Sequence, residues 1–312
     1  MRQFGRMAAW LLCAVVISAS PAVHAQGSEP VKLAVGVDAA YVPMYLAKQR
    51  KLFEKHGVNV EIVQFTQGGD SLDALVAGQV AVGSAAQPTT LIRAARADIK
   101  TFGIFGQSGT YIKLLVKPSI TDPKQLKKIG IVPGSVSEYA TEGLLTKYGI
   151  DPKSVELVKL GPPEAPALLA RGDIDGYFLW EPWPTNGVKQ GGKILLNSGD
   201  VGFVDNMWLS AEGKWLASHQ AEAKAILAAL AEACEIVRAN PNDAAAAVQK
   251  EVKIPAATAL EILKDRECVV RDFTAEDMAS YDKIADFLVS HKITPVKLDV
   301  GKVVQKGFYS GK

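Results

Sequence analysis

The chain has 312 residues, of which 48% are hydrophobic and 22% are charged. This length is enough for two lobes or for one large α/β unit with a sizeable core. Its 35 basic residues nearly balance its 33 acidic ones, so no overall field favours nucleic acid or an anionic membrane as a partner. Any charged ligand therefore has to be held by local groups.

The first 25 residues are predicted to form a secretory signal peptide. Arg2 and Arg6 precede an apolar run over residues 7–17, and Val23-His24-Ala25 ends in small residues suited to cleavage. The apolar run is too short for a membrane-spanning helix, which needs roughly twenty residues. Cys13 lies inside this run, so we expect no lipoprotein anchor there. The mature chain is expected to be exported to the periplasm.

Strands and helices alternate over residues 26–108. Apolar and β-branched runs predict four strands, and helical spacing predicts the segments between them as helices. Gly57 and Gly78 are placed to end two of these helices. The four strands are expected at residues 31–37, 58–63, 80–83 and 101–105. Alternation of this kind requires parallel strands joined by helical crossovers.

The pattern breaks at residues 107–110 and then begins again. Further strands are expected at residues 111–116, 129–132, 155–160, 176–179 and 193–196, with helices between them. Residues 109–205 are therefore predicted to form a second α/β lobe.

The rest of the chain is predicted to be almost wholly helical, because it is rich in alanine with apolar residues at three- and four-residue steps. The helices are expected at residues 219–238, 242–251, 256–265 and 275–291. They have few strands of their own to cover, so we expect them to pack back on the first lobe. That lobe would then comprise residues 26–108 and 206–312.

The predicted fold class is therefore α/β, with two lobes, parallel-dominated sheets, flanking helices and a two-stranded hinge that permits closure around a ligand. Cys234 and Cys268 remain in the mature chain. In an oxidising compartment they could bridge two neighbouring helices. The alternative is a pair of buried thiols, and no spacing rule decides between the two.

A short sequence pattern recurs in the two lobes. Gly78 and Gly172 each end a helix, and each is followed at the same distance by a proline that can start the next one. The strand between them ends at Gln87 in the first lobe and at Trp180-Glu181 in the second. We interpret these two turns as facing walls of one small-molecule cleft, with Gln87 opposite Glu181.

Parallel α/β sheets bind ligands at the carboxyl ends of their strands, where helix N-termini offer free N–H groups and a partial positive charge. The loops at those ends supply the candidate binding residues, which are Asp38, Tyr41, Gly69, Asp70, Gln87, Ser135, Ser137, Trp180 and Glu181. No arginine or lysine falls in these loops, and Arg93 and Arg96 lie a turn or more into their helix. The carboxylates therefore favour a ligand that donates hydrogen bonds over a simple anion.

Several candidates have a purely structural alternative. Ser135 with Glu138 matches a capping box, and Asp70 can cap its helix in a similar way. Trp180 could be a core aromatic residue. Glu181 could serve only to place a negative charge at a helix start. The sequence leaves each of these alternatives open.

The chain resembles the substrate-binding proteins of ABC importers for sulfonates, taurine, nitrate and thiamine-pyrimidine precursors. The resemblance covers essentially the whole mature chain and rests on Pro43-Met44-Tyr45-Leu46-Ala47, residues 52–57, 78–83 and 172–176, and Trp180-Glu181-Pro182. It implies a type II periplasmic-binding fold that closes on a small ligand and delivers it to an inner-membrane ABC permease. The ligand class implied is an aliphatic sulfonate, taurine or a similar molecule, with a pyrimidine or aromatic acid as the alternative.

An enzyme is the rival interpretation, because similar folds include a pyrimidine-precursor synthase. That activity would require a cysteine-rich motif and cofactor-binding lysine or histidines in the cleft. The histidines His56, His219 and His291 lie at helix ends instead, and no nucleophile–base pair or metal spacing is found. We therefore expect no catalytic residue, no metal site and no cofactor, and a monomeric protein. A sensor role would use the same binding site and is not separated by the sequence.

Overall fold

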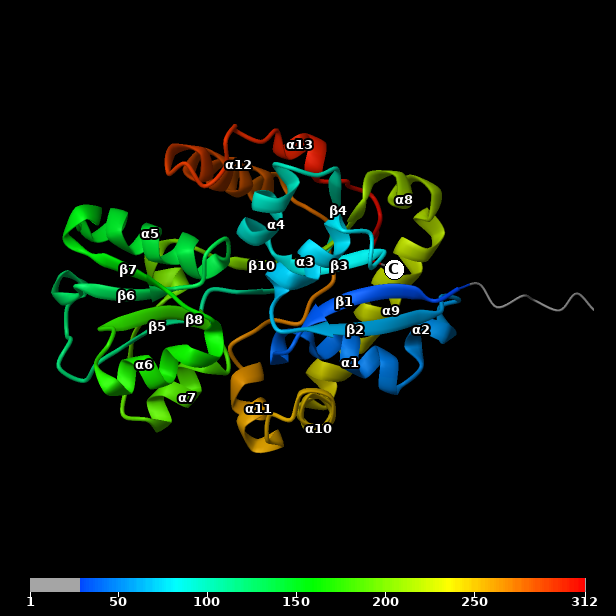
Figure 1. Ribbon diagram of the computed structural model, residues 1–312. Helices are drawn as coiled ribbons and strands as arrows, with labels where there is room; N and C mark the ends of the chain where they lie inside the picture. Colours follow the sequence, from blue (N-terminus) through cyan, green and yellow to red (C-terminus); the bar gives the residue numbers. More distant parts are fainter. Residues whose placement is uncertain (1–28, 312) are drawn as a thin grey trace, which may run out of the picture.

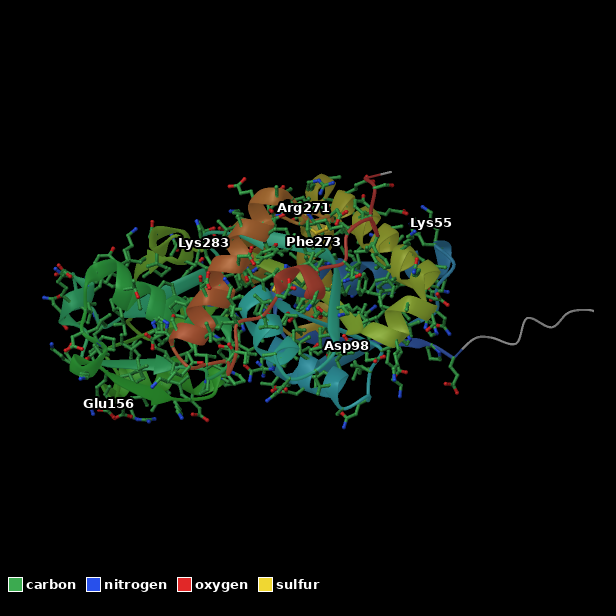
Figure 2. The ribbon with its side chains drawn as sticks, turned by 90° about the horizontal axis from the view of Figure 1, so that it is seen from above. Lys55, Asp98, Glu156, Arg271, Phe273 and Lys283 are labelled. Carbon is green, nitrogen blue, oxygen red and sulfur yellow. A yellow bond between two sulfur atoms is a disulfide. The ribbon has the colours of Figure 1, made fainter. Side chains whose placement is uncertain are left out.

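The structure is a computed structural model that describes residues 29–311. The signal peptide expected at residues 1–25 lies outside the described residues. Two five-stranded sheets lie side by side, each with helices on its faces (Figure 1). The molecule is elongated along the line that joins them, with Lys55 and Glu156 near its opposite ends (Figure 2). Within residues 29–311, no helix combines the length and apolar character needed to cross a membrane.

The first sheet has the strand order β2-β1-β3-β10-β4. Its strands are β1 (Val31–Gly36), β2 (Val60–Phe65), β3 (Val82–Ala86), β4 (Ile99–Ser108) and β10 (Asp205–Glu212). Strand β1 pairs in parallel with β2 and β3, whereas β10 runs antiparallel between β3 and β4. The helices between these strands are α1 (Val42–Gln49), α2 (Leu52–Lys55), α3 (Gly68–Val76) and α4 (Gln87–Ala94).

The second sheet has the order β7-β6-β8-β5-β9. Its strands are β5 (Ile112–Val116), β6 (Lys128–Ile131), β7 (Glu156–Lys159), β8 (Gly176–Trp180) and β9 (Lys193–Asn197). Its helices are α5 (Val136–Tyr148), α6 (Ala165–Arg171) and α7 (Trp183–Lys189). Strand β6 is parallel to both of its neighbours, and β5 is antiparallel to both of its own.

The two-lobe α/β prediction is confirmed, but the sheets are mixed rather than dominated by parallel pairs. In the first sheet both antiparallel pairs involve β10, and in the second sheet both involve β5. Each of these strands is the first that the chain forms after it crosses from the other lobe. Strand β10 was not predicted. Seven of its eight residues are buried, so it lacks the alternation of polar and apolar residues that identifies a half-buried strand.

The C-terminal helices are α8 (Gly213–Ser218), α9 (Gln220–Ala239), α10 (Pro241–Val252), α11 (Ala256–Leu263), α12 (Ala275–Ser290) and α13 (Val300–Val303). The four that were predicted are confirmed, with ends that differ by at most two residues. As predicted, α9 and α10 pack on the first lobe, against α1. Helix α12 lies over the junction between the two sheets in both views (Figures 1 and 2).

The chain crosses between the sheets twice, after β4 and before β10, as a two-stranded hinge requires. A third segment, Asp265 to Cys268, runs beside the first crossing. Gln107 and Glu267 exchange backbone hydrogen bonds of 3.1 and 3.0 Å, and Lys113 Nζ lies 2.6 Å from Asp265 Oδ2. The lobe limits 26–108, 109–205 and 206–312 stay a prediction about the units that move.

Cys234 and Cys268 form a disulfide. Of the two alternatives that the sequence left open, the bridge is therefore the one present. It does not join two helices, because Cys268 lies in the extended segment that follows α11. The bond anchors this segment to α9, two residues away from Arg266.

Candidate ligand-binding cleft

A cleft lies between the two sheets, at the carboxyl ends of β1, β3, β6 and β8. It has about 400 Å³ of empty space, counting the part open to solvent. Residues of both lobes line it, and they include Asp38, Tyr41, Gly68, Gly69, Thr89, Tyr111, Ser135, Val136, Trp180, Asp205, Met207 and Arg266. The position matches the rule that ligands bind where parallel strands end.

Helices α3 and α5 begin at this cleft, one from each lobe. Gly68 and Gly69 form the first turn of α3, and Ser135 and Val136 begin α5. Within the described residues, the backbone N–H groups of these four residues have no acceptor. Two sets of free donors and two positive helix ends therefore meet in one space, which suits an oxyanion.

Arg266 is a cleft residue that the sequence analysis missed. Its side chain is only 4% exposed and forms an ion pair with Asp205 through Nη2. Its guanidinium carbon lies 4.2 Å from the centre of the Tyr111 ring, a cation–π contact. Nε and Nη1 have no hydrogen-bond partner among the described residues. The cleft thus contains a buried cation with unused donors.

Nothing local in the sequence marks Arg266. It follows the predicted helix 256–265, whose last residues unwind into a turn beyond Leu263. Contacts with residues far away in the chain bring it to the cleft, among them the pairing of Glu267 with Gln107 and the disulfide of Cys268. The expectation of a cleft without a basic residue is therefore wrong, and so is the argument against an anion that it supported.

Asp38 lies beside Arg266 and carries an unusual carboxyl group. Its Oδ1 accepts hydrogen bonds from the Ala40 N–H (2.6 Å) and the Tyr111 hydroxyl (3.1 Å). Burial raises the pKa of Asp38 to about 6, although these hydrogen bonds and the nearby Arg266 charge oppose the increase. Asp38 can therefore gain or lose a proton near neutral pH.

Five of the predicted binding residues line the cleft: Asp38, Tyr41, Gly69, Ser135 and Trp180. Tyr41 is nearly inaccessible and its hydroxyl donates to the Ser84 carbonyl at 3.3 Å. Trp180 is half-buried at the end of β8. Their contact with a ligand stays a prediction.

The other four predicted residues, Asp70, Gln87, Ser137 and Glu181, do not line the cleft. The Gln87 side chain binds the second crossing instead, donating to Val204 O at 2.7 Å and accepting from Asn206 N at 2.8 Å. Ser137 Oγ accepts from the Val132 N–H, and Asp70 Oδ1 accepts from the Gln67 amide. The hydrogen bonds of these three side chains are thus made within the protein: Gln87 bonds distant backbone, Ser137 bonds nearby backbone and Asp70 bonds the neighbouring Gln67 side chain.

Glu181 is fully buried and its carboxylate is already paired. Oε1 lies 2.6 Å from Lys113 Nζ, and Oε2 accepts from the Thr185 N–H at 3.1 Å. Glu181 therefore does not face Gln87 across the cleft. Of Gln87, Trp180 and Glu181, the three residues predicted to form opposing walls, only Trp180 lines the cleft. Lys113 lies on the neighbouring strand β5 and not in a predicted loop, so the sequence did not indicate that it would pair with Glu181.

The start of α5 is capped by Ser135 but is not a capping box. Ser135 Oγ accepts from the Ser137 N–H at 3.1 Å, as a helix cap does. Glu138, however, accepts from the Gly134 N–H at 2.8 Å and not from the Ser135 N–H. The serine is both a cap and a cleft residue, and its own N–H is left free.

Comparison with known proteins agrees with this architecture. A curated Escherichia coli (strain K12) relative, "Putative aliphatic sulfonates-binding protein", is 26% identical over 299 residues, 93% of each chain. The taurine-binding periplasmic protein of the same organism is 31% identical over 179 residues, 56% of each chain. The crystal structure of the periplasmic aliphatic sulphonate binding protein SsuA from Escherichia coli superposes with a TM-score of 0.79. It is 24% identical and covers 88% of this chain and 97% of its own.

An enzyme is also among the relatives. The 4-amino-5-hydroxymethyl-2-methylpyrimidine phosphate synthase of Schizosaccharomyces pombe is 30% identical over 140 residues, 44% of this chain and 40% of its own. Within residues 29–311, no group of three or more His, Cys, Asp and Glu side chains could hold a metal ion.

Two mixed α/β lobes around a central cleft define the periplasmic-binding-protein fold. The chain belongs to the NMT1-like family, whose model matches residues 24–251.

Proposed function

We propose that this protein captures a small organic anion between its lobes, outside the cytoplasm, and delivers it to an ABC importer. The single observation that carries the proposal is the buried guanidinium of Arg266, with two nitrogens unpaired beside the cleft. A buried donor without a partner costs free energy, about 1–3 kcal/mol for each group. An acceptor group of a ligand removes that cost.

The chemistry around Arg266 favours a sulfonate. Sulfonate has three acceptor oxygens, and the cleft offers donors on two sides: the guanidinium and the N–H groups of Gly69 and Ser135. Trp180 provides apolar surface for the organic part of the ligand. Nitrate would leave that surface unused, so we favour an organic anion over an inorganic one.

Two acidic groups extend the ligand class. Asp38 and Asp205 both line the cleft, and Oδ1 of Asp205 has no hydrogen-bond partner among the described residues. A ligand that carries both a sulfonate and an amine or N–H group would pair with Arg266 through the sulfonate and with the carboxylates through its N–H donors. Taurine-like aminosulfonates are therefore the preferred class, and a pyrimidine or aromatic acid stacked on Trp180 is the alternative.

Isothermal titration calorimetry on residues 26–312 tests this proposal. The panel comprises taurine, ethanesulfonate, nitrate, an aromatic acid and a pyrimidine. We expect one-to-one binding that is tightest for a sulfonate. In Arg266→Lys, which keeps the charge but loses the planar fork, affinity should fall on the order of 10- to 100-fold. Arg271→Lys is the matched control, because Arg271 pairs with Asp277 away from the cleft. Binding of no compound, or equal affinity in Arg266→Lys, would overturn the proposal.

Import requires an inner-membrane permease and periplasmic localisation, and the binding proteins among the relatives support this setting. We further propose that the protein is a monomer. Catalysis is the competing activity. Incubation of the protein with each bound compound, followed by mass spectrometry, should return the compound unchanged, and any turnover would replace import with enzymatic function.

A further inference from the structure

Arg93 makes a contact between the two lobes at the edge of the cleft. It lies on α4 in the first lobe, and its Nη1 donates to the carbonyl of Gly134, in the loop before α5 of the second lobe. Neither Arg93 nor Gly134 lines the cleft, whereas the next residue, Ser135, does. The Arg93 contact is therefore on the outer side of the peptide group whose inner side faces the ligand space.

The geometry of that peptide links the Arg93 contact to the direction of the Ser135 N–H. The bond between Gly134 and Ser135 is trans, so its carbonyl and its N–H point in opposite directions. A carbonyl held by Arg93 on the outer side turns the Ser135 N–H toward the cleft. The preceding N–H, that of Gly134, is held by Glu138, which leaves the Ser135 N–H as a free donor.

Arg93 is itself fixed on the first lobe. Its Nε and Nη2 donate to the two oxygens of Asp73 at 3.2 and 3.0 Å. Gly69 makes room for it, because a Cβ at this position would lie 2.9 Å from Arg93 Nη2. The guanidinium thus reaches Gly134 only when the second lobe has approached the first.

We propose that Arg93 is a positioning residue that couples lobe closure to ligand affinity. It orients the Ser135 N–H, a ligand donor of the second lobe, only in the closed state. The inference rests on the proposed function, because the donor needs a bound anion to act on. Its consequence is kinetic: the closed complex holds the anion with one more aligned donor, so the contact slows dissociation and hardly affects the encounter.

Arg96 provides a matched control on the same helix. It also binds Asp73, at 2.8 Å, but its side chain is 61% exposed and it makes no hydrogen bond to the second lobe within the described residues. Arg93→Gln and Arg96→Gln therefore remove the same charge and the same acidic partner. They differ in the contact with Gly134 and also in burial, because the Arg93 side chain is only 11% exposed and makes a second hydrogen bond to Asp73.

The experiment measures taurine and ethanesulfonate binding by stopped-flow tryptophan fluorescence and calorimetry. In Arg93→Gln we expect affinity to fall roughly tenfold or more, through a faster dissociation rate and a nearly unchanged association rate. Arg93→Lys can still donate to Gly134 and should recover part of the loss. Arg96→Gln should bind within about twofold of the unmodified protein. Thermal unfolding shows whether each variant is folded.

Small-angle X-ray scattering adds a readout that does not depend on affinity. With ligand at saturation, Arg93→Gln should remain less compact than Arg96→Gln. Equal dissociation rates and equal compaction in the two variants would overturn the inference while leaving the proposed function intact. Failure of the unmodified protein to bind either sulfonate would overturn the proposed function and this inference together.

Discussion

Asp38 is the cleft residue whose charge depends most on the surrounding fold. In water its carboxyl group would be ionised throughout the neutral range. Burial raises its pKa to about 6, so within the cleft it changes from mostly protonated at pH 5 to mostly ionised at pH 8. Because Arg266 shares the same cleft, the proton on Asp38 alters the charge that a bound anion meets.

This produces a pH dependence of ligand affinity. A sulfonate stays ionised between pH 5 and 8, so its affinity should rise as the pH falls through about 6, where Asp38 loses its negative charge. Calorimetry with ethanesulfonate at pH 5, 6, 7 and 8 measures this trend. Asp38→Asn keeps the hydrogen-bond acceptor and should give a flat profile, whereas an unchanged slope in that variant would assign the titration to another group.

The same pKa bears on stability. The folded-state pKa of Asp38 lies above its ordinary value of 3.8, so its contribution to stability is fully present below pH 4 and is lost as the pH rises through about 6. Urea unfolding measures the stability of Asp38→Asn and of the unmodified protein at pH 5 and 8. The stability of the variant relative to the unmodified protein should be higher at pH 8 than at pH 5. The upper bound of this difference in the free energy of unfolding is about 3 kcal/mol.

Trp180 is expected to contact the organic part of the ligand. Trp180→Ala should weaken sulfonate binding by about 1–3 kcal/mol, because a stacked aromatic surface is lost. Trp183 is the control, since it starts α7 and does not line the cleft. Calorimetry on Trp180→Ala and Trp183→Ala separates the two positions. Equal losses would mean that both tryptophans act only by supporting the lobe.

At the scale of elements, the segment Asp265 to Cys268 carries the central charge of the cleft. It has no helix or strand of its own, so other elements hold it. The disulfide joins it to α9, and the ion pair between Asp265 and Lys113 joins it to β5. A loop residue becomes a rigid part of the site through these attachments.

Removing the disulfide should therefore affect both stability and binding. Its two cysteines are 34 residues apart, and a loop of that size corresponds to about 4 kcal/mol of stabilisation through the unfolded state. The double variant Cys234→Ala/Cys268→Ala should unfold at a lower temperature and bind sulfonate more weakly, because Arg266 loses an anchor. Calorimetry far below the unfolding temperature distinguishes the two effects, and full affinity there would show that the segment needs no such anchor.

At the scale of the whole molecule, α12 links the lobes. Phe287 on this helix packs edge-on against Tyr139 on α5, with ring centres 4.8 Å apart. Tyr139 also contacts Phe203 at 4.9 Å, beside the second crossing. These rings come together from both lobes, so they stabilise the arrangement of the lobes that the structure describes.

Phe287→Leu should shift the molecule toward the open state. An aromatic pair contributes about 0.5–1.5 kcal/mol beyond area burial, so affinity should fall roughly two- to tenfold. The ligand-free radius of gyration, measured by small-angle scattering, should increase. Phe308→Leu is the control, because Phe308 pairs with Phe102 inside the first lobe. The same expansion in both variants would point to general loosening rather than opening.

Much of the fold could be predicted because its signals are local. Apolar runs placed the strands from β1 to β9, and alanine-rich periodicity placed the four long C-terminal helices. The rule that strand ends bind ligands located Asp38, Gly69 and Ser135 at the cleft. The same rule failed for Gln87 and Glu181, because it identifies loops and cannot tell which way a side chain points.

The sequence by itself determined the two α/β lobes and the places where their loops meet, because hydrophobic periodicity and helix boundaries depend on neighbouring residues. Only the tertiary structure decided the charge of the cleft. Arg266 reaches it through strand-like pairing with Gln107, and Lys113 neutralises Glu181 from a neighbouring strand. Such contacts join residues far apart in the chain, and the balance of charges at a site depends on them.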